Sequence, residues 1–394
     1  MRVGFFFPNY FPYVRRGAER VMVEYGRYLT GQGHDVDIVT TKPGKRRVVK
    51  NGKLNVYYES QLNHPVLAQY KPLFRFYSFS LMAMKHLLTR DYDVLHMWLY
   101  MYGLPMRLTR RLKGTPYLYH QMMETTVVPE PFDEWLFRNV VIPADRVATL
   151  TNGFAAKLEK QIGVPVDILP PCVDMDTFVP TGERDVSEPR ILFASDVHDY
   201  HKGGHVILKA WDEIHRRCPE AILSFGGPGG QTGIPTFQTF NLLDEYVKTP
   251  EARKRIEFLG VGSEGDVPRR YARSSVTILP SVWEGFGLVL LESLACGTPV
   301  VGNGCGGPGE IITDERIGAT ISVPDFPTLA DPKLPGELAE RVLHAIDLAR
   351  RPETNDICRE HARQWSREAV GEKLEEIYGE MVNNPVKRPV EVAA

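Results

Sequence analysis

The sequence predicts an α/β protein built from two doubly wound, Rossmann-like domains that face each other across a cleft. Short apolar runs alternate with helical stretches from residue 2 to about residue 169, a linker rich in proline and charge follows, and the alternation restarts at residue 190. Strands separated by helices form right-handed βαβ units and mostly parallel sheets. At 394 residues, the chain also has the length of two such domains.

The elements of the first half follow from periodicity and stop signals. A helix is expected over 18–29, where apolar side chains recur at helical spacing, and Gly31-Gln32-Gly33 ends it. Short apolar or alternating runs predict strands at 2–7, 36–39, 93–96, 116–120, 147–150 and 166–169. Pro170-Pro171 and the charged segment 178–185 are typical of a linker.

The second half repeats this pattern without a detectable sequence repeat. Strands are expected at 190–194, 221–225, 256–259, 276–279 and 298–301, and helices at 204–217, 288–295, 337–350 and 368–381. We therefore predict a domain over 1–182, a domain over 183–368, a C-terminal helix over 369–383 that crosses back to the first domain, and a loose tail over 384–394.

Composition excludes several classes of protein. Apolar residues make up 43% of the chain and charged residues 24%, as in ordinary globular proteins, and no apolar run is long enough to span a membrane. The five cysteines lack zinc-site spacing, and the first eight residues do not resemble a signal peptide, so we expect reduced thiols and a cytoplasmic protein. Residues 1–113 hold 19 Lys and Arg against 7 Asp and Glu, a local net charge of 19 − 7 = +12. This balance indicates an anionic partner for the first domain, such as the inner face of a membrane. Residues 186–394 carry a net charge of 23 − 31 = −8, and a basic domain joined to an acidic one argues against nucleic acid as a partner of the whole chain.

Residues 72–90 form a predicted helix that is apolar nearly all round and carries scattered cations. A basic loop precedes it, with Lys42, Lys45, Arg46, Arg47, Lys50 and Lys53. One interpretation is a peripheral membrane face that reaches a lipid-linked acceptor. The other is a core helix beside a solvated basic loop.

The segment from Pro280 to Glu292 carries the most chemical information. It runs from a strand end through a glycine-rich turn into a helix, and Gly285 and Gly287 let the backbone approach a ligand closely. The new helix offers free N–H groups to an anion. Glu284 and Glu292 lie just over two helical turns apart, so both carboxylates can face one cavity at different depths, where they suit sugar or ribose hydroxyls.

This segment resembles the signature of glycosyltransferase family 4, retaining enzymes with the GT-B fold. The resemblance covers residues 1 to about 382. Further similar pieces are Arg16-Gly17-Ala18-Glu19, Tyr119-His120, the linker Pro171–Pro180, His201-Lys202-Gly203 and Gly306–Ile311. The Glu284/Glu292 segment and the linker are specific to the family. Each of the other pieces is weak evidence alone, and they support the resemblance only because they occur in the same order as in the family.

The resemblance implies a role for each matching residue. Glu284 would contact the transferred sugar, Glu292 would hold the nucleotide ribose, and Lys202 would neutralise the leaving diphosphate. Gly17, Gly285, Phe286, Gly287 and Leu288 would complete the donor site, the last three through backbone amides. Arg16, Gly17, Glu19 and His96 are expected on the acceptor side, and the proposed catalytic residues are His120, Glu284 and Lys202.

Two positions depart from the family pattern, and one position has two candidates. Family members carry an arginine shortly before the lysine, which the run from Ser195 to Lys202 lacks; His198, His201 and Arg273 are alternatives for the second diphosphate cation. Arg16 replaces the first glycine of the N-terminal turn. For the functional histidine at a strand end of the first domain, we favour His120 over His96.

The sequence thus predicts a retaining, metal-independent hexosyltransferase that uses a UDP- or GDP-sugar and an acceptor sugar, lipid-linked or small. No cofactor is expected: the run 302–307 fits GxGxxG but lies outside the first βαβ unit. No metal site is expected either, since no pair of nearby aspartates gathers further ligands. The alternatives are a non-catalytic nucleotide-sugar-binding protein of this fold, and a phosphorylase or epimerase.

Overall fold

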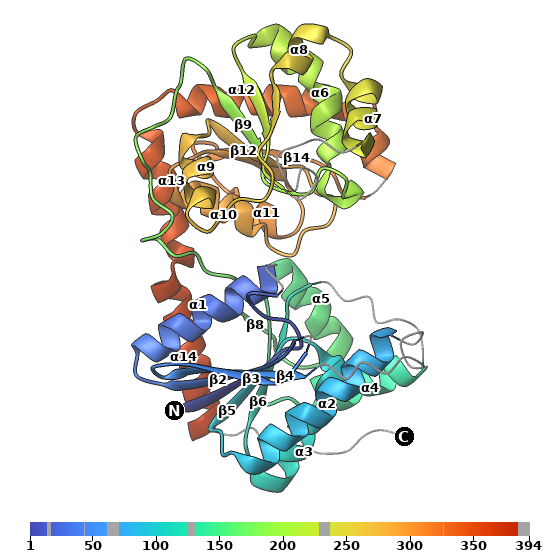
Figure 1. Cartoon of the computed structure of the whole chain (residues 1–394), viewed down its shortest axis with the longest axis vertical. Helices are drawn as coiled ribbons and strands as arrows, with labels where there is room; N and C mark the ends of the chain where they lie inside the picture. The colour runs from blue at the N-terminus through green and yellow to red at the C-terminus, as the bar shows by residue number, and fades with distance from the viewer. Residues whose placement is uncertain are drawn as a thin grey trace. The chain divides into compact units, whose positions relative to one another are not determined.

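In the computed structural model, the contacts within the chain fall into two compact units (Figure 1). The structure describes residues 1–13, 17–42, 44–60, 71–123, 131–227, 237–325 and 327–384. Unit 1 comprises Met1–Cys172 and Arg367–Ala394, and unit 2 comprises Val173–Ser366. The divisions therefore fall at 172/173 and 366/367, whereas the sequence suggested 182/183 and 368/369. The linker belongs to unit 2 because Arg359 donates hydrogen bonds to the carbonyls of Met175 and Phe178.

In unit 1, the described residues form an eight-stranded sheet in the order β3-β4-β2-β1-β5-β6-β7-β8. The strands are β1 (Arg2–Phe6), β2 (Asp35–Lys42), β3 (Arg47–Asn51), β4 (Leu54–Ser60), β5 (Val94–Met97), β6 (Tyr117–Gln121), β7 (Arg146–Thr149) and β8 (Asp167–Ile168). All neighbours run parallel except β3 and β4, which form an antiparallel pair. The prediction of a basic loop is therefore wrong for two of its residues. Arg47 and Lys50 lie on the exposed edge strand β3, which pairs with β4 through its backbone.

Two helices of unit 1 pack against each other although they lie far apart in the sequence. They are α1 (Gly17–Gly31) and α14 (Arg367–Asn383). A Cβ added to Gly371 would lie 2.3 Å from the Tyr28 ring, so the glycine allows this close approach. Glu375 accepts a hydrogen bond from the Tyr28 hydroxyl and lies 2.8 Å from Nε2 of His34. The C-terminal helix thus completes the first unit rather than the second.

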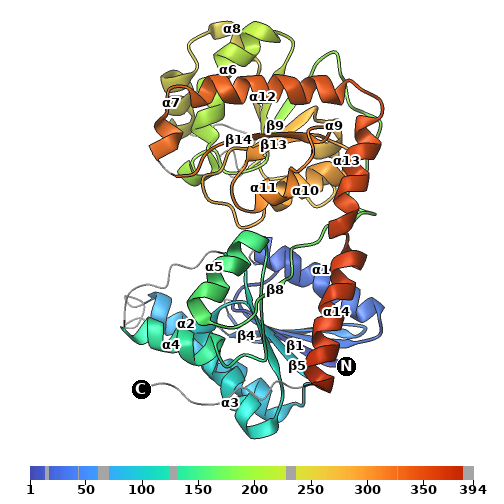
Figure 2. The same ribbon diagram turned by 180° about the vertical axis from the view of Figure 1, so that it is seen from behind.

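Three further helices lie on the other side of the unit 1 sheet in Figures 1 and 2. They are α2 (Lys71–Thr89), α3 (Leu104–Lys113) and α4 (Pro131–Val141); η2 (Tyr100–Tyr102) precedes α3, and α5 (Asn152–Ile162) follows β7. In α2, Phe79, Ala83 and Leu87 are buried at helical spacing, whereas Leu81 and Leu88 are 71% and 57% exposed. The helix is therefore a core element on one face, with leucines left on the other. Within the described residues, no helix is long and apolar enough to cross a membrane.

Unit 2 contains a six-stranded parallel sheet in the order β11-β10-β9-β12-β13-β14. The strands are β9 (Arg190–Phe193), β10 (Ile222–Phe225), β11 (Ile256–Phe258), β12 (Val276–Leu279), β13 (Val300–Asn303) and β14 (Gly318–Ile321). The helices are α6 (Gly204–Arg217), α7 (Phe237–Tyr246), α8 (Pro250–Lys254), α9 (Asp266–Arg273), α10 (Leu288–Ala295), α11 (Gly307–Ile311), α12 (Leu334–Ala349) and α13 (Thr354–Ala362), with the short η3 (Tyr200–Lys202), η5 (Pro327–Ala330) and η6 (Arg363–Trp365).

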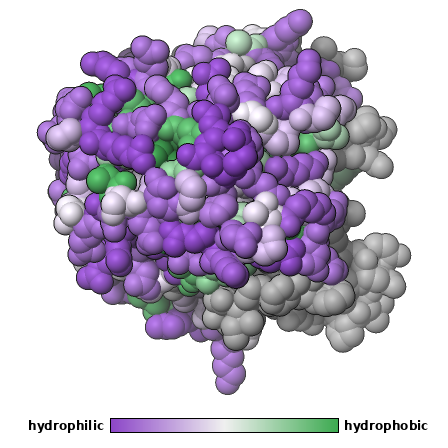
Figure 3. All heavy atoms as spheres, turned by 90° about the horizontal axis from the view of Figure 1, so that it is seen from above, coloured by the Kyte–Doolittle hydropathy of each residue, from purple (hydrophilic) through white to green (hydrophobic). Residues whose placement is uncertain are grey.

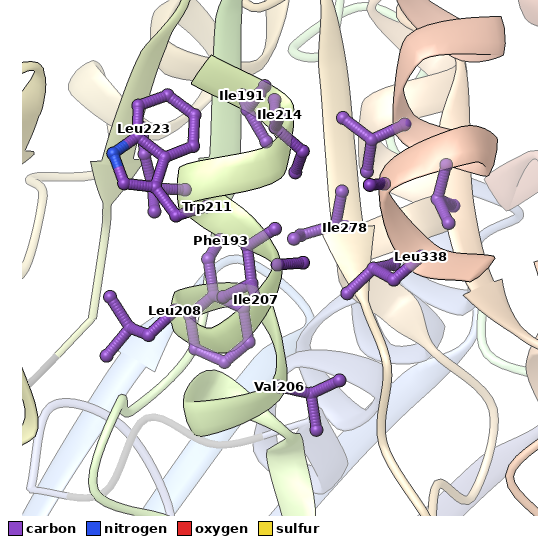
Figure 4. Packing of buried hydrophobic residues seen from close by; sticks show 14 of the residues in the cluster. Ile191, Phe193, Val206, Ile207, Leu208, Trp211, Ile214, Leu223, Ile278 and Leu338 are labelled. Atoms are coloured by element: carbon purple, nitrogen blue, oxygen red, sulfur yellow. The ribbon is translucent and has the colours of Figure 1, made fainter. Parts of the chain in front are cut away.

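The core of unit 2 lies between the sheet and helices α6 and α12. Trp211 and Ile207 of α6 pack with Phe193 of β9 and Ile278 of β12, all without exposed surface (Figure 4). On the face of the molecule seen from above, hydrophilic side chains predominate and apolar ones are scattered (Figure 3). A well-buried parallel sheet of this kind binds ligands at the carboxyl ends of its strands.

Candidate functional site

Two chain segments meet at the carboxyl ends of neighbouring strands β9 and β12 in unit 2. Gly203 has a φ of +74°, and a Cβ added to it would lie 2.4 Å from the carbonyl oxygen of Pro280. The Val282 N–H donates to the His201 carbonyl at 3.0 Å. The glycine and this hydrogen bond therefore hold the start of α6 against the loop that follows β12.

This packing brings Lys202 and Glu284 into direct contact. The Nζ atom of Lys202 donates to Oε2 of Glu284 at 2.8 Å. Their side chains are 28% and 17% exposed, so both groups remain accessible from solvent. The structure thus joins two residues that are 82 positions apart and that the sequence proposed for leaving-group and sugar contacts.

Glycines shape the turn between Glu284 and α10. Gly287, with a φ of +94°, precedes the first residue of α10, and the opening N–H groups of a helix lack acceptors within it. A Cβ added to Gly307 would lie 2.2 Å from Cα of Phe286. Gly306 and Gly307 at the end of the run 302–307 therefore pack against the backbone of this turn.

Glu292 lies on the buried side of α10. Its side chain is 2% exposed and accepts a hydrogen bond from the Tyr271 hydroxyl at 3.0 Å. The Glu284 side chain is 17% exposed, so the two carboxylates lie at different depths, and the prediction that they face one cavity stays a prediction. Sequence reasoning missed Tyr271, which lies on the buried face of the strongly basic helix α9.

Ser281 is a second residue that sequence reasoning missed. It lies two residues after the end of β12, is fully buried, and its Oγ has no hydrogen-bond partner among the described residues. Asn303 at the end of β13 donates to the Ser281 carbonyl at 2.8 Å and to the Val323 carbonyl at 2.6 Å. The loop that leads from β12 to Glu284 therefore carries a buried hydroxyl without a partner, which no sequence pattern singled out.

The segment that lacks the expected arginine forms two side-chain-capped turns. Asp196 accepts from the His198 N–H, and Asp199 accepts from the His201 N–H, each at 3.0 Å. Arg273 lies elsewhere: its Nε is 3.8 Å from Glu183, near Arg190 at the amino end of β9. Arg273 is therefore wrong as the second diphosphate cation.

His201 remains a candidate for the second diphosphate cation. It is exposed, and its ring centroid lies 6.4 Å from that of Trp283, which is 40% exposed.

In unit 1 the two candidate histidines form one buried cluster. The rings of His96 and His120 lie 5.3 Å apart, and neither residue has exposed surface. His120 stacks on Tyr25, and Nδ1 of His96 lies 2.6 Å from the Tyr378 hydroxyl of α14. Burial lowers the pKa of His120 to about 3 and that of His96 well below its usual value, so both rings are neutral at physiological pH.

The N-terminal turn is partly described. Gly17 is exposed at the start of α1, and open space surrounds a Cβ added to it. Glu19 is 2% exposed and lies on the buried face of α1. Arg16 lies outside the described residues, so its predicted place on the acceptor side stays a prediction. Across the described ranges, His, Cys, Asp and Glu form no group able to hold a metal ion.

Comparison with protein families matches nearly the whole chain. The family described as "Glycosyltransferase Family 4" matches residues 15–177, and "Glycosyl transferases group 1" matches residues 178–365. The junction between the two matches falls close to the division between the units.

The curated relatives are also named as glycosyltransferases. The D-inositol 3-phosphate glycosyltransferase of Paenarthrobacter aurescens is 28% identical over 58% of this chain and 60% of its own length. D-inositol 3-phosphate glycosyltransferase 2 of Catenulispora acidiphila is 25% identical over 74% of this chain and 72% of its own. The chain thus spans about three fifths of the length of the first of these relatives.

Solved structures share the fold along the whole chain. Sucrose-phosphate synthase from Thermosynechococcus elongatus superposes with a TM-score of 0.77, at 18% identity, over 97% of this chain and 99% of that one. Anabaena HepE in complex with UDP-glucose gives 0.65, at 15% identity, over 96% and 99%. The predicted fold class, two Rossmann-like domains of the GT-B type, is confirmed. The chain belongs to glycosyltransferase family 4.

Proposed function

We propose that this chain is a retaining hexosyltransferase that transfers a sugar from a UDP- or GDP-sugar to an acceptor hydroxyl without a metal ion. The observation that carries the proposal is the pair formed by Lys202 and Glu284 at the carboxyl ends of β9 and β12. A cation and a carboxylate in contact match the two demands of the reaction, a leaving diphosphate and a sugar with several hydroxyls. The names of the curated relatives support the same reaction class.

Within this proposal, unit 2 stabilises the leaving group. The Lys202 ammonium and the free N–H groups at the start of α10 would surround the diphosphate, where fixed charges and dipoles stabilise developing negative charge. Glu284 would accept hydrogen bonds from the transferred sugar. Glu292 would reach the ribose after its hydrogen bond with Tyr271 is exchanged or shared.

Catalysis would then rest on positioning and charge stabilisation. The described site offers no cysteine, serine or carboxylate paired with a base as an activated nucleophile. The acceptor oxygen would bond to the anomeric carbon on the face from which the diphosphate departs, and the leaving phosphate would take the acceptor proton. Retention then requires neither a protein general base nor a covalent bond between the protein and the sugar. Holding donor and acceptor in reacting geometry contributes a large part of such a rate enhancement.

The acceptor is proposed to be a polyol or sugar, either small or lipid-linked. The curated relatives are named for a phosphorylated cyclitol, and the basic balance of residues 1–113 suits an anionic acceptor. His120 is still proposed as a catalytic residue, and Gly17 is still proposed to contact both the donor and the acceptor. Since His120 is fully buried, such a role requires a rearrangement of the cluster around it.

A thermal-shift panel tests the donor site. UDP, GDP, ADP and their common sugar conjugates would be added to the wild type, to Lys202→Ala and to Glu292→Gln, with Lys254→Ala as an exposed control in the same unit. A nucleotide at a hundred times its Kd adds about 2.7 kcal/mol of stability. We expect one nucleotide class to stabilise the wild type and the control fully, Glu292→Gln by about half as much because its affinity is about tenfold lower, and Lys202→Ala not at all. Stabilisation that survives in Lys202→Ala would contradict this donor site.

The missing arginine supports a second candidate, a nucleotide-sugar-binding protein without transfer activity. Arg273 does not replace it, since it lies at the opposite end of the strands. Incubation with the stabilising nucleotide sugar and a panel of sugar and polyol acceptors separates the two candidates. Release of free nucleoside diphosphate that depends on the acceptor supports the transferase, and binding without release supports the second candidate. Sugar phosphate formed from inorganic phosphate would instead indicate a phosphorylase, and an epimer formed without acceptor would indicate an epimerase.

A further inference from the structure

Helix α3 in unit 1 exposes a row of leucines. Leu104, Leu108 and Leu112 are 38%, 40% and 64% exposed, and they recur every four residues. Residues at that spacing lie on one face of a helix. The opposite face of α3 buries Met106 and Thr109, so the helix is already anchored and its exposed leucines are not needed for the core.

The neighbouring helix α2 extends this row. Leu81 and Leu88 are 71% and 57% exposed, and Lys113 of α3 donates to the carbonyl oxygen of Leu88 at 3.3 Å. The C-terminal ends of α2 and α3 therefore lie side by side, as Figures 1 and 2 also show. We call these five leucines, together with the exposed cations Lys85 and Arg111, the leucine face. Adjacent exposed leucines mark an interaction surface more often than single scattered ones do.

The leucine face is predominantly basic. Helix α3 contains Arg107, Arg110, Arg111 and Lys113 and no acidic residue. Arg110 and Lys113 pair with Asp145 and with the exposed Asp91. Arg111 and Lys85 are exposed, and neither forms an ion pair within the described part of the chain. Exposed cations on the same helices as exposed leucines suit a surface that offers hydrocarbon and negative charge together.

We infer that the leucine face docks unit 1 on an anionic lipid bilayer, with the leucines entering the interface and the cations meeting lipid phosphates. Charge complementarity favours a bilayer: the surrounding residues 1–113 carry a net charge of 19 − 7 = +12. Docking does not depend on the sugar chemistry; only its use for a lipid-linked acceptor rests on the proposed function.

Vesicle co-sedimentation of the full chain tests the docking. Vesicles of phosphatidylcholine alone and of phosphatidylcholine with phosphatidylglycerol would be compared at low and high salt, without nucleotide. We expect binding only to the anionic vesicles and weaker binding at high salt. Because each cation near an anionic surface contributes about 1 kcal/mol, Lys85→Ala with Arg111→Ala should lower the partition constant about thirtyfold.

The leucines are tested by Leu108→Glu combined with Leu112→Glu. The matched control is Val261→Glu, which alters an equally exposed aliphatic residue of unit 2, 62% against 64% for Leu112. We expect the double variant to lose anionic-vesicle binding at least about tenfold, with an unchanged melting temperature, and the control to bind like the wild type. Wild-type protein that ignores anionic vesicles, or a double variant that binds them fully, would overturn the inference. A concentration-dependent dimer that the double variant abolishes, without vesicle binding, would also overturn it.

Discussion

The candidate functional groups are partly exposed to solvent in unit 2 and fully buried in unit 1. In unit 2, Lys202 and Glu284 contact each other at the sheet edge and stay partly exposed. In unit 1, His96 and His120 are sealed among aromatic rings, with no exposed surface. The candidate groups of unit 2 can therefore be reached from solvent in the structure as it stands, whereas the histidines of unit 1 cannot.

Removing the charges of the unit 2 pair should have the largest effect. Lys202→Ala is expected to lower sugar transfer about 10²–10³-fold, the usual loss when one group that stabilises developing negative charge is removed. Steady-state release of nucleoside diphosphate measures this. Lys254→Ala should transfer at the wild-type rate. A fully active Lys202→Ala would show that the cation is not part of the transfer site.

Glu284→Gln separates the two roles of the pair. In the free protein, the carboxylate competes for Lys202 with any incoming diphosphate. The amide variant should therefore bind free nucleoside diphosphate several-fold more tightly and yet transfer sugar about 10²-fold more slowly. Isothermal titration and the transfer assay measure the two quantities. Weaker diphosphate binding by this variant would mean that the pair does not open on binding.

Glu292 and Tyr271 offer a comparison within unit 2. Glu292→Gln is expected to weaken nucleotide binding about tenfold if the carboxylate holds the ribose, since hydrogen bonds to charged groups contribute about 1.5–3 kcal/mol. Tyr271→Phe removes the partner but keeps the carboxylate, so its nucleotide affinity should stay close to that of the wild type. Equal losses of affinity in both variants would indicate that the pair only supports α10.

The buried histidines of unit 1 should make the free energy of unfolding depend on pH. Because burial lowers the pKa of His120 from 6.5 to about 3, the unfolded chain binds more protons between these values. The stability contributed by the neutral ring is complete above pH 6.5 and is lost as the pH falls toward 3. Each such group contributes a slope of up to about 1.4 kcal/mol per pH unit.

Urea unfolding between pH 5 and pH 7.5 tests this slope by comparing the wild type with His120→Leu. Since His86 and His205 also have lowered pKa values, the variant should reduce the slope by about one proton and not abolish it. An unchanged slope would show that His120 is accessible to protons, in contrast to its burial.

The smallest expected effect concerns thiol reactivity. Cys305 is exposed, whereas Cys172 of unit 1 is buried and burial raises its thiol pKa. Cys305 precedes Gly306 and Gly307, which pack on the Glu284 turn. A thiol reagent should label Cys305 in the native protein, and the bound nucleotide should slow the labelling a few-fold. Labelling of Cys172 at a similar rate would contradict the difference between the two units.

Sequence patterns predicted most of the parallel strands because buried strands form continuous apolar runs. They missed the edge strand β3, whose residues Arg47–Asn51 are mainly polar and pair through the backbone alone. They also missed β4, and β14, where Gly318 begins a short strand. Among the helices they missed α3, α4, α5, α7, α8, α9, α11 and α13. The cluster of His96 and His120 could not be predicted either, since it depends on Tyr378 returning from the far end of the chain.

The sequence by itself determined the fold class, the family and the two residues Lys202 and Glu284, because a glycine-rich turn between a strand and a helix leaves a local signature. The tertiary structure decided which of the chosen groups are accessible. Gly203 packs on Pro280 and joins Lys202 to Glu284, whereas the rotation of α10 buries Glu292. Exposure depends on contacts between segments far apart in the chain, so local residue order cannot specify it.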